Sequence, residues 1–328
     1  MSTSSGFDEV TSVLATWRLP APTTVSTPLT GVTHETLLLE TTAGAYALRT
    51  YRYTDRAPIE HEHAVILHAR GQGAAAIAPL PLPAGETILE RGGRYHALYP
   101  RARGMQLRRD DLGIAEAALM GQCLAEVHQA LRSFPGESAP RRSNSISQEQ
   151  TLADITMLEQ SIRARPTLDQ VDHWALARLA GRRAWLVEAA TVTLPDLAEL
   201  EHQVLHGDYQ ESNLFFEGGQ VSAVIDWDHS HVAPREWEIV RALDLVFKLQ
   251  PRPARAFLCA YQQRLPVALS DLDLMARWYS AVRAHDLWLF KAVYLEGNER
   301  ARRFIYPGAF VPFGERWASS RAAPEWAD

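Results

Sequence analysis

The feature that most restricts the fold of this chain is an abrupt change of sequence pattern near Pro100. Before that residue, short apolar segments at 34–41 and 45–52 flank one glycine-containing turn, and a second pair of such segments lies within 86–99. Paired segments of this kind are typical of antiparallel hairpins. We therefore expect the first hundred residues to contain a small antiparallel sheet.

Helical patterns dominate the sequence that follows. Residues 110–134 carry apolar side chains at helical spacing, with few β-branched residues and no internal proline. Within the sheet region, one helix is expected between Pro58, a favourable first helical residue, and Gly71. The remaining expected helices cover 149–164, 169–190, 252–264 and 270–296. This order of elements predicts an α+β fold with two lobes, the smaller built on the antiparallel sheet and the larger mainly helical.

The composition limits the classes of function. The 328 residues carry a formal net charge of −6, whereas a nucleic-acid-binding domain would show a concentrated basic face. No window approaches the ~20 apolar residues of a membrane span, and the N-terminal residues lack the basic and apolar parts of a signal peptide. The two cysteines, Cys123 and Cys259, have no metal-binding or redox spacing. We expect a cytoplasmic protein without nucleic-acid or membrane partners.

The segment HGDYQESNLFF, residues 206–216, gathers several chemically capable side chains. Its last three residues and segment 221–225 are strand-like and flank Glu-Gly-Gly-Gln, which predicts a hairpin. Asn213 directly precedes the first strand and Asp226 directly follows the second, so the hairpin should bring their side chains together. Asp228 would point to the same side if the chain stays extended.

Oxygen-bearing side chains that meet at one point suit a hard divalent cation. Mg²⁺ accepts one or two protein oxygens and keeps its other positions for water and phosphate. We expect Asn213 and Asp226 to be the ligands, and Asp208 to accept the proton of a hydroxyl that attacks a phosphoryl group. Asp228 is either a further metal or supporting carboxylate or a cap for the helix expected from Pro234. Loop capping is the structural alternative for the whole set.

The motifs HGDYQESN and IDWD resemble the H-G-D-x-x-x-x-N and I-D-[WF]-[DE] motifs of the aminoglycoside phosphotransferase and choline kinase-like family. Members of this family are relatives of protein kinases. The resemblance implies Asp208 as catalytic base, Asn213 and Asp226 as magnesium ligands, and His206 as a support of the catalytic loop. It also implies a bilobal, protein-kinase-like fold that binds ATP, with GTP as the alternative donor.

The resemblance extends to the nucleotide-binding part of the chain. In the family, a turn after the first strand covers the phosphates, which places Thr30, Gly31 and Thr33 nearest to them in this sequence. The third strand carries a cation for the α- and β-phosphates. Arg49 lies at that position, and Arg52 is the competing candidate. An arginine keeps its charge and can bind phosphate through two N–H groups.

In the same family, a glutamate on the following helix pairs with that cation. Glu62 fits the position better than Glu60, although the two lie only half a turn apart. The connector between the lobes would be 95–99, whose backbone groups are expected to bind the adenine edge, with Ala97 and Tyr99 as the contacting residues.

The resemblance therefore implies a nucleotide-binding lobe at 1–100 and a helical lobe at 101–328 that carries the catalytic loop and the acceptor site. The expected function is ATP- and Mg²⁺-dependent transfer of the γ-phosphoryl group to a hydroxyl of a small molecule. Aromatic and acidic side chains of the C-terminal half favour a cationic acceptor such as an aminoglycoside or choline. Basic side chains there argue the other way, and homoserine, which carries both charges, is also compatible. A nucleotide- or metabolite-binding module without catalysis is the alternative.

Overall fold

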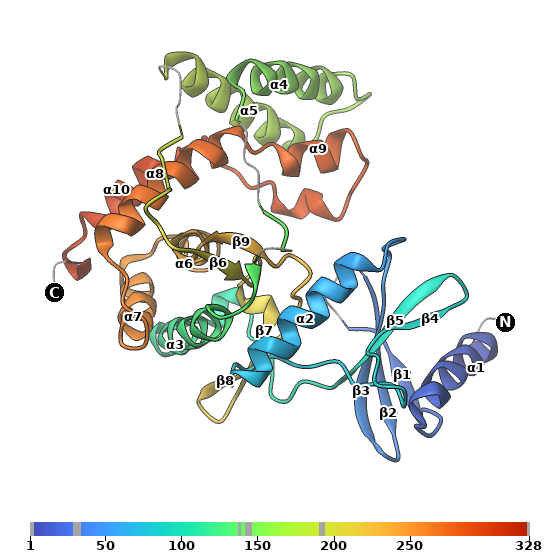
Figure 1. The fold of residues 1–328 in the computed structure, drawn as a ribbon. Helices are drawn as coiled ribbons and strands as arrows, with labels where there is room; N and C mark the ends of the chain where they lie inside the picture. The colour runs from blue at the N-terminus through green and yellow to red at the C-terminus, as the bar shows by residue number, and fades with distance from the viewer. Residues whose placement is uncertain (1–2, 29–33, 137–138, 142–145, 190–193, 327–328) are drawn as a thin grey trace. The chain divides into compact units, whose positions relative to one another are not determined.

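The computed structural model describes residues 3–28, 34–136, 139–141, 146–189 and 194–326 (Figure 1). By their internal contacts the residues form two compact units. Unit 1 holds residues 1–141, 202–248 and 252–266, and unit 2 holds residues 142–201, 249–251 and 267–328. Within the described ranges, no helix combines the length and the hydrophobicity that crossing a membrane requires.

A five-stranded antiparallel sheet forms the N-terminal part of unit 1 (Figure 1). The strands lie in the order β1-β2-β3-β5-β4. Their bounds are β1 Thr24–Ser26, β2 Glu35–Thr41, β3 Gly44–Thr50, β4 Leu89–Arg91 and β5 Arg94–Pro100. Both hairpins expected from the sequence, β2–β3 and β4–β5, are confirmed. The second turns through Gly92 and Gly93, which both have positive φ.

The rest of unit 1 is mainly helical and contains two further strand pairs, β6 with β9 and β7 with β8. Its helices are α1 Thr3–Leu14, η1 Ala15–Trp17, α2 Ala57–Gly71, η2 Arg109–Asp111, α3 Ile114–Leu131, η4 Glu211–Asn213, α6 Arg235–Leu245 and α7 Pro251–Gln262. The additional strands are β6 His202–Leu205, β7 Leu214–Glu217, β8 Gln220–Val224 and β9 His231–Pro234. Helix α1 and the β6–β9 pair have no counterpart among the elements expected from the sequence.

A helix covers each face of the five-stranded sheet. On one face, apolar side chains of α1 and η1 pack against Leu39, Leu48 and Leu98. Side chains alternate along a strand, so Arg49 and its strand partner Ala97 point to the other face. Helix α2 packs on that face, where its Ile59 shares a buried cluster with Ala97. Arg49 therefore faces α2.

Helices α3 and α7 approach each other closely within unit 1. A Cβ atom on Gly121 would lie 2.0 Å from the carbonyl oxygen of Phe257, so the crossing requires glycine on α3. The carbonyl oxygen of Met120, the preceding residue, accepts a hydrogen bond from the Tyr209 hydroxyl at 2.8 Å. This bond ties the segment that carries the HGD motif to the buried side of α3.

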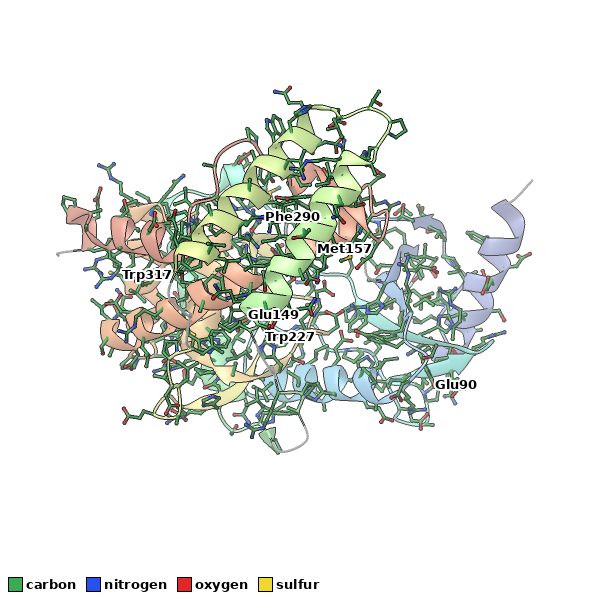
Figure 2. The ribbon with its side chains drawn as sticks, turned by 90° about the horizontal axis from the view of Figure 1, so that it is seen from above. Glu90, Glu149, Met157, Trp227, Phe290 and Trp317 are labelled. Atoms are coloured by element: carbon green, nitrogen blue, oxygen red, sulfur yellow. The ribbon has the colours of Figure 1, made fainter. Side chains whose placement is uncertain are left out.

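Unit 2 is built from helices. They are α4 Gln148–Arg163, α5 Gln170–Glu188, α8 Leu269–His285, α9 Trp288–Tyr294, η5 Ala301–Phe304, α10 Phe313–Arg321 and η6 Pro324–Trp326. The core of this unit gathers Leu158 of α4, Leu179 of α5 and Phe290 of α9. Figure 2 labels Phe290 and also Met157, a neighbour of Leu158 on α4 whose side chain is exposed.

The single helix expected over residues 270–296 is wrong, because the chain forms α8 and α9 with a break at Asp286. The backbone of Asp286 is extended, with φ −80° and ψ 107°. Its Oδ1 accepts a hydrogen bond at 3.0 Å from the backbone N–H of Trp288, the first residue of α9. Apolar residues continue on both sides of Asp286, so the pattern alone does not reveal the break.

Candidate active site

The hairpin formed by β7 and β8 brings Asn213 and Asp226 to its open end. Leu214 pairs with Val224 in the register of the two strands. The backbone N–H of Ile225 donates to the carbonyl oxygen of Asn213 at 3.0 Å. Asp226 then leaves the strand with a φ of 66°, in the left-handed region that non-glycine residues seldom adopt. Backbone of this kind is concentrated at functional sites.

Asp208 lies in the loop before this hairpin, and both oxygens of its carboxylate accept hydrogen bonds. Oδ2 accepts from Gln210 Nε2 at 2.8 Å and from Asn213 Nδ2 at 3.0 Å. Oδ1 accepts from Arg241 Nη2 at 2.5 Å. These donors fix the orientation of the carboxylate. A carboxylate has about four lone-pair positions, so this arrangement still has room for the hydroxyl of a substrate.

His206 is fully buried and links the loop to the end of β8. Its Nδ1 accepts from the backbone N–H of Asp208 at 3.2 Å. In this pattern Nε2 carries the proton and donates to the carbonyl oxygen of Ile225 at 2.9 Å. The centre of the imidazole ring lies 4.6 Å from that of Trp227, which is labelled in Figure 2. These contacts hold the backbone of Asp208 beside the residue that precedes Asp226.

Gly207 lets the loop pass close to a neighbouring segment. Its φ is 86°, a conformation that residues with a side chain rarely adopt. A Cβ atom at this position would lie 2.0 Å from the carbonyl oxygen of His229. The path of the backbone therefore requires the glycine between His206 and Asp208.

Arg49 joins the sheet to the hairpin. Its Nη1 lies 2.9 Å from Glu62 Oε1, and its Nη2 lies 2.8 Å from Asp226 Oδ1. Burial disfavours the charged guanidinium, yet the surrounding negative charges, led by Glu62, raise the pKa of Arg49. Burial also raises the pKa of Glu62 above its usual range, and the guanidinium opposes that shift. Glu60 instead lies on the surface and pairs with Arg56, so Glu62 is the helix carboxylate that contacts Arg49.

Asp228 lies beside the same guanidinium, with only 1% of its side chain exposed. Its Oδ2 is 3.6 Å from Arg49 Nη2 and 3.3 Å from His34 Nε2. Neither carboxylate oxygen has a hydrogen-bond partner within the described part of the chain. Helix α6 begins at Arg235 without a side-chain cap. The alternative that Asp228 caps this helix is therefore wrong.

The oxygens of Asn213, Asp226 and Asp228 suit a magnesium ion. The amide nitrogen of Asn213 donates to Asp208, so its carbonyl oxygen is the atom that could bind a cation. The buried carboxylate of Asp228 offers oxygens that make no hydrogen bond to the described residues. Among all the residues that the structure describes, no three or more His, Cys, Asp or Glu side chains form a group that could hold a metal ion by themselves. An amide and two carboxylates would leave the other positions of an octahedral ion to water or phosphate oxygens.

Arg52, the competing candidate for phosphate binding, is exposed just beyond β3. Its backbone N–H donates to His34 Nδ1 at 3.3 Å. Thr30, Gly31 and Thr33, which the sequence predicts near the phosphates, lie outside the described residues. Their contact with a nucleotide stays a prediction.

The residues predicted to contact adenine lie in β5. Ala97 pairs with Arg49 in the register of β3 and β5. The Tyr99 hydroxyl lies 2.9 Å from that of Tyr51, close to the buried face of α2. The backbone of this segment is thus paired within the sheet, and its contact with an adenine ring stays a prediction.

Glu238 supports the loop that carries Asp208, and the sequence analysis missed this role. Its buried carboxylate accepts from the backbone N–H groups of His206 at 3.2 Å and Gly207 at 2.6 Å. His128 Nε2 lies 3.0 Å from the same carboxylate. Burial alone would raise the pKa of Glu238, but the contacts with His128, His206 and Gly207 lower it to about 2. The only signal in the sequence was a glutamate in the first turn of the helix after Pro234.

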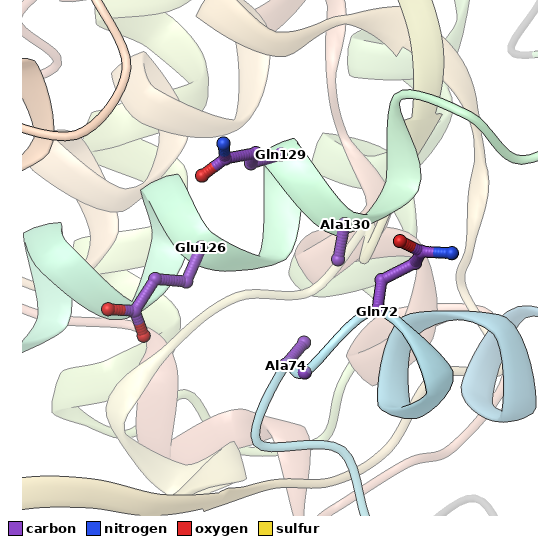
Figure 3. A pocket seen from close by; sticks show the side chains of 6 residues that line it. Gln72, Ala74, Glu126, Gln129 and Ala130 are labelled. Atoms are coloured by element: carbon purple, nitrogen blue, oxygen red, sulfur yellow. The ribbon is translucent and has the colours of Figure 1, made fainter.

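A separate pocket of about 290 Å³ lies in unit 1 between the end of α2 and α3 (Figure 3). It is lined by Gln72, Gly73, Ala74, Glu126, Gln129 and Ala130. None of the residues discussed above lines this pocket, and it is not part of the candidate site.

The site combines a strand arginine paired with a helix glutamate, a loop aspartate, and a hairpin with further oxygen-bearing side chains. This is the arrangement that a kinase-like phosphotransferase requires. The chain belongs to the phosphotransferase enzyme family, whose model matches residues 24–287. This confirms the family resemblance of the HGD and IDWD motifs.

Individual proteins show the same relationship. The homoserine kinase of Chelativorans sp. (strain BNC1) is 27% identical over 253 residues, which cover 75% of this chain and 72% of that protein. The structure of spectinomycin phosphotransferase APH(9)-Ia with ADP and spectinomycin gives a TM-score of 0.67 at 14% identity, covering 97% of this chain and 95% of the other. The structure of amicoumacin kinase hAmiN with AMP-PNP, Ca²⁺ and Ami gives a TM-score of 0.57 at 15% identity. This match covers 94% of this chain and 96% of the other.

These structures establish the fold. The expected α+β, protein-kinase-like class is confirmed, with a five-stranded antiparallel sheet and a mainly helical remainder. The chain is a small-molecule kinase whose acceptor is an alcohol group. The alternative of a binding module without catalysis has no support among these relatives.

Proposed function

We propose that this kinase uses ATP and Mg²⁺ to phosphorylate the hydroxyl of a small amino-acid alcohol, with L-homoserine as the first candidate. The observation that carries the proposal is the convergence of Asp208, Asn213 and Asp226 at the open end of one hairpin. The homoserine kinase of Chelativorans supports the acceptor. The structure of spectinomycin phosphotransferase holds ADP, and that of amicoumacin kinase holds AMP-PNP and Ca²⁺. Both support an adenine nucleotide, and the second supports a divalent cation. We therefore propose ATP, rather than GTP, as the phosphoryl donor.

Phosphate binding is assigned to the charges around Arg49. Its N–H groups would bind the α- and β-phosphates, while Glu62 holds the guanidinium against α2. Asn213, Asp226 and Asp228 would hold Mg²⁺, which supplies positive charge to the phosphate oxygens when bound. Arg49 contacts Asp226 at 2.8 Å, so the proposed phosphate-binding and metal-binding groups are direct neighbours.

Asp208 would act as the general base. The proton of the acceptor hydroxyl passes to a carboxylate oxygen of Asp208 as the hydroxyl oxygen forms its bond to the γ-phosphorus. The bond from that phosphorus to the bridging oxygen breaks, and its electron pair leaves with ADP. Most of the rate should come from positioning and charge stabilisation. His206 and Glu238 contribute by fixing the loop that carries the base.

We assign the two parts of the reaction to two consecutive parts of the chain. Residues 1–100 would bind the nucleotide, and residues 101–328 would supply the catalytic loop and the acceptor site. The proposed partner is a small-molecule alcohol, and both ATP and an amino-acid alcohol of this kind would be met in the cytoplasm.

An acceptor panel tests the proposed function. With ATP and Mg²⁺, the purified protein should form ADP and O-phosphohomoserine from L-homoserine. Choline, an aminoglycoside and 3-amino-1-propanol serve as the other acceptors, and we expect their kcat/KM to be at least about 10-fold lower. ADP release gives the rate, and phosphorus NMR identifies the product. Nucleotide binding without transfer to any acceptor of this panel would contradict the proposed amino-acid alcohol as acceptor.

Substitution of Arg49 tests the assignment of the phosphate-binding cation. Arg49→Lys should raise the KM for ATP by about 10- to 100-fold, because lysine keeps the charge but loses the paired N–H groups. Arg52→Lys is the matched control and should leave the KM within about 2-fold, because Arg52 lies exposed beyond β3. A large effect of Arg52→Lys together with a normal Arg49→Lys enzyme would transfer the role to Arg52.

A further inference from the structure

Arg241 contacts the proposed base from a different element of unit 1. It lies on α6, and its Nη2 donates to Asp208 Oδ1 at 2.5 Å. Its guanidinium carbon is 5.7 Å from the ring centre of Trp237, one turn earlier on the same helix. The side chains of Arg241 and Asp208 are 18% and 16% exposed, so both remain partly accessible.

The acidic side chains of the same helix are not available to a cationic acceptor. Glu238 is fully buried and holds the loop backbone. Glu236 is also buried, and its Oε1 lies 3.2 Å from Arg235 Nε. Asp244, the third acidic residue of α6, is buried as well. Helix α6 therefore presents a positive charge, rather than a negative one, directly beside Asp208.

One nitrogen of Arg241 has unused donors. Nη1 is buried and makes no hydrogen bond to any described residue. A buried N–H group without a partner costs free energy. A guanidinium also presents its five donors in one plane and matches a carboxylate through two parallel bonds. An oxygen ligand that reaches this group would thus satisfy donors that the described residues leave unpaired.

We propose that Arg241 binds the carboxylate of the acceptor, beside the hydroxyl that Asp208 deprotonates. This inference rests on the proposed function and narrows its substrate class to hydroxylated acids. A guanidinium shared by Asp208 and the acceptor would offset the repulsion between their carboxylates. An acceptor with an ammonium group at the same point would meet the like charge of Arg241 at close range.

The chemistry of homoserine fits this arrangement. Three carbon atoms separate its carboxylate carbon from its hydroxyl oxygen, so one short molecule can contact both Arg241 and Asp208. Choline offers a permanent positive charge at the corresponding end and has no carboxylate for a guanidinium to bind. The ion pair between α6 and the loop therefore selects for an acid and against a quaternary ammonium.

A pair of acceptors that differ only in the carboxylate isolates the role of Arg241. L-Homoserine and 3-amino-1-propanol share the hydroxyl and the amine, and only the first has the acid. Because Arg241 also contacts Asp208, Arg241→Gln should lower kcat with both acceptors, but it should raise the KM for L-homoserine by about 10-fold more than the KM for 3-amino-1-propanol. Arg241→Lys should recover part of the lost affinity. Arg264→Gln is the control, since Arg264 is a surface residue of unit 1 that pairs with Glu126.

Several outcomes overturn the inference. Equal losses with both acceptors would make Arg241 a structural support of Asp208, and unchanged constants would remove it from the site. If the wild-type enzyme prefers 3-amino-1-propanol to L-homoserine, hydroxylated acids are excluded as the substrate class. The proposed phosphoryl transfer to an alcohol would still stand. If no alcohol is phosphorylated, the proposed function fails. Calorimetric titration of L-homoserine into wild-type and Arg241→Gln protein then still decides the inference, because binding should weaken by a similar factor if Arg241 holds the carboxylate.

Discussion

Replacing Asp208 with asparagine is expected to lower kcat by about 1,000-fold and to leave the Kd for ATP within about 2-fold of the wild-type value. The amide keeps the shape of the side chain but cannot take the proton of the acceptor hydroxyl. The amide nitrogen of the asparagine would replace one carboxylate oxygen, and its N–H groups would then face other donors. These donors are Gln210 and Asn213 on one side and Arg241 on the other. Steady-state ADP formation measures kcat, and calorimetric titration measures the Kd.

The control for this prediction is Asp110→Asn. Asp110 is an exposed carboxylate on η2 and should change neither quantity by more than about 2-fold. Thermal unfolding of Asp208→Asn checks that the loop still folds. A variant that turns over at a near-normal rate would remove Asp208 from the role of base, and a variant that loses nucleotide affinity would place Asp208 in nucleotide binding instead.

The local part of the site could be predicted because a short hairpin determines it. Asn213 and Asp226 are 13 positions apart in sequence, and the turn between β7 and β8 brings both to one end. Alternation along the strands and the glycine-rich turn suffice for that conclusion. The same local logic predicts both hairpins of the five-stranded sheet.

The contact of Arg49 with Asp226 joins residues 177 positions apart and could not be derived from local patterns. The family resemblance identified both residues, and the structure shows them within hydrogen-bond distance. Arg241 and Glu238 were missed for a related reason. Which residues of α6 face the catalytic loop depends on how that helix packs, and periodicity cannot distinguish a glutamate that binds loop backbone from one that faces water.

Replacing Glu238 with glutamine is expected to lower the free energy of unfolding at pH 7 by about 3 kcal/mol. Glutamine keeps one carbonyl oxygen for the N–H of Gly207 but turns donors towards the N–H of His206 and towards His128. Buried donors would then face each other. Chemical denaturation measures the loss. Glu126→Gln is the control, since Glu126 lies at the surface beside Arg264 and its replacement should cost less than about 1 kcal/mol.

The pH dependence of this difference tests whether the charge of Glu238 is the stabilising feature. Its pKa is about 2 in the folded chain, against 4.5 for an unperturbed glutamate. Because the folded pKa is depressed, the stabilisation is fully present above about pH 4.5 and is lost as the pH falls towards 2. The stability gap between the wild-type protein and Glu238→Gln should therefore be constant near neutrality and shrink through that acid range. A gap that stays constant down to pH 2 would mean that shape, rather than charge, holds the catalytic loop.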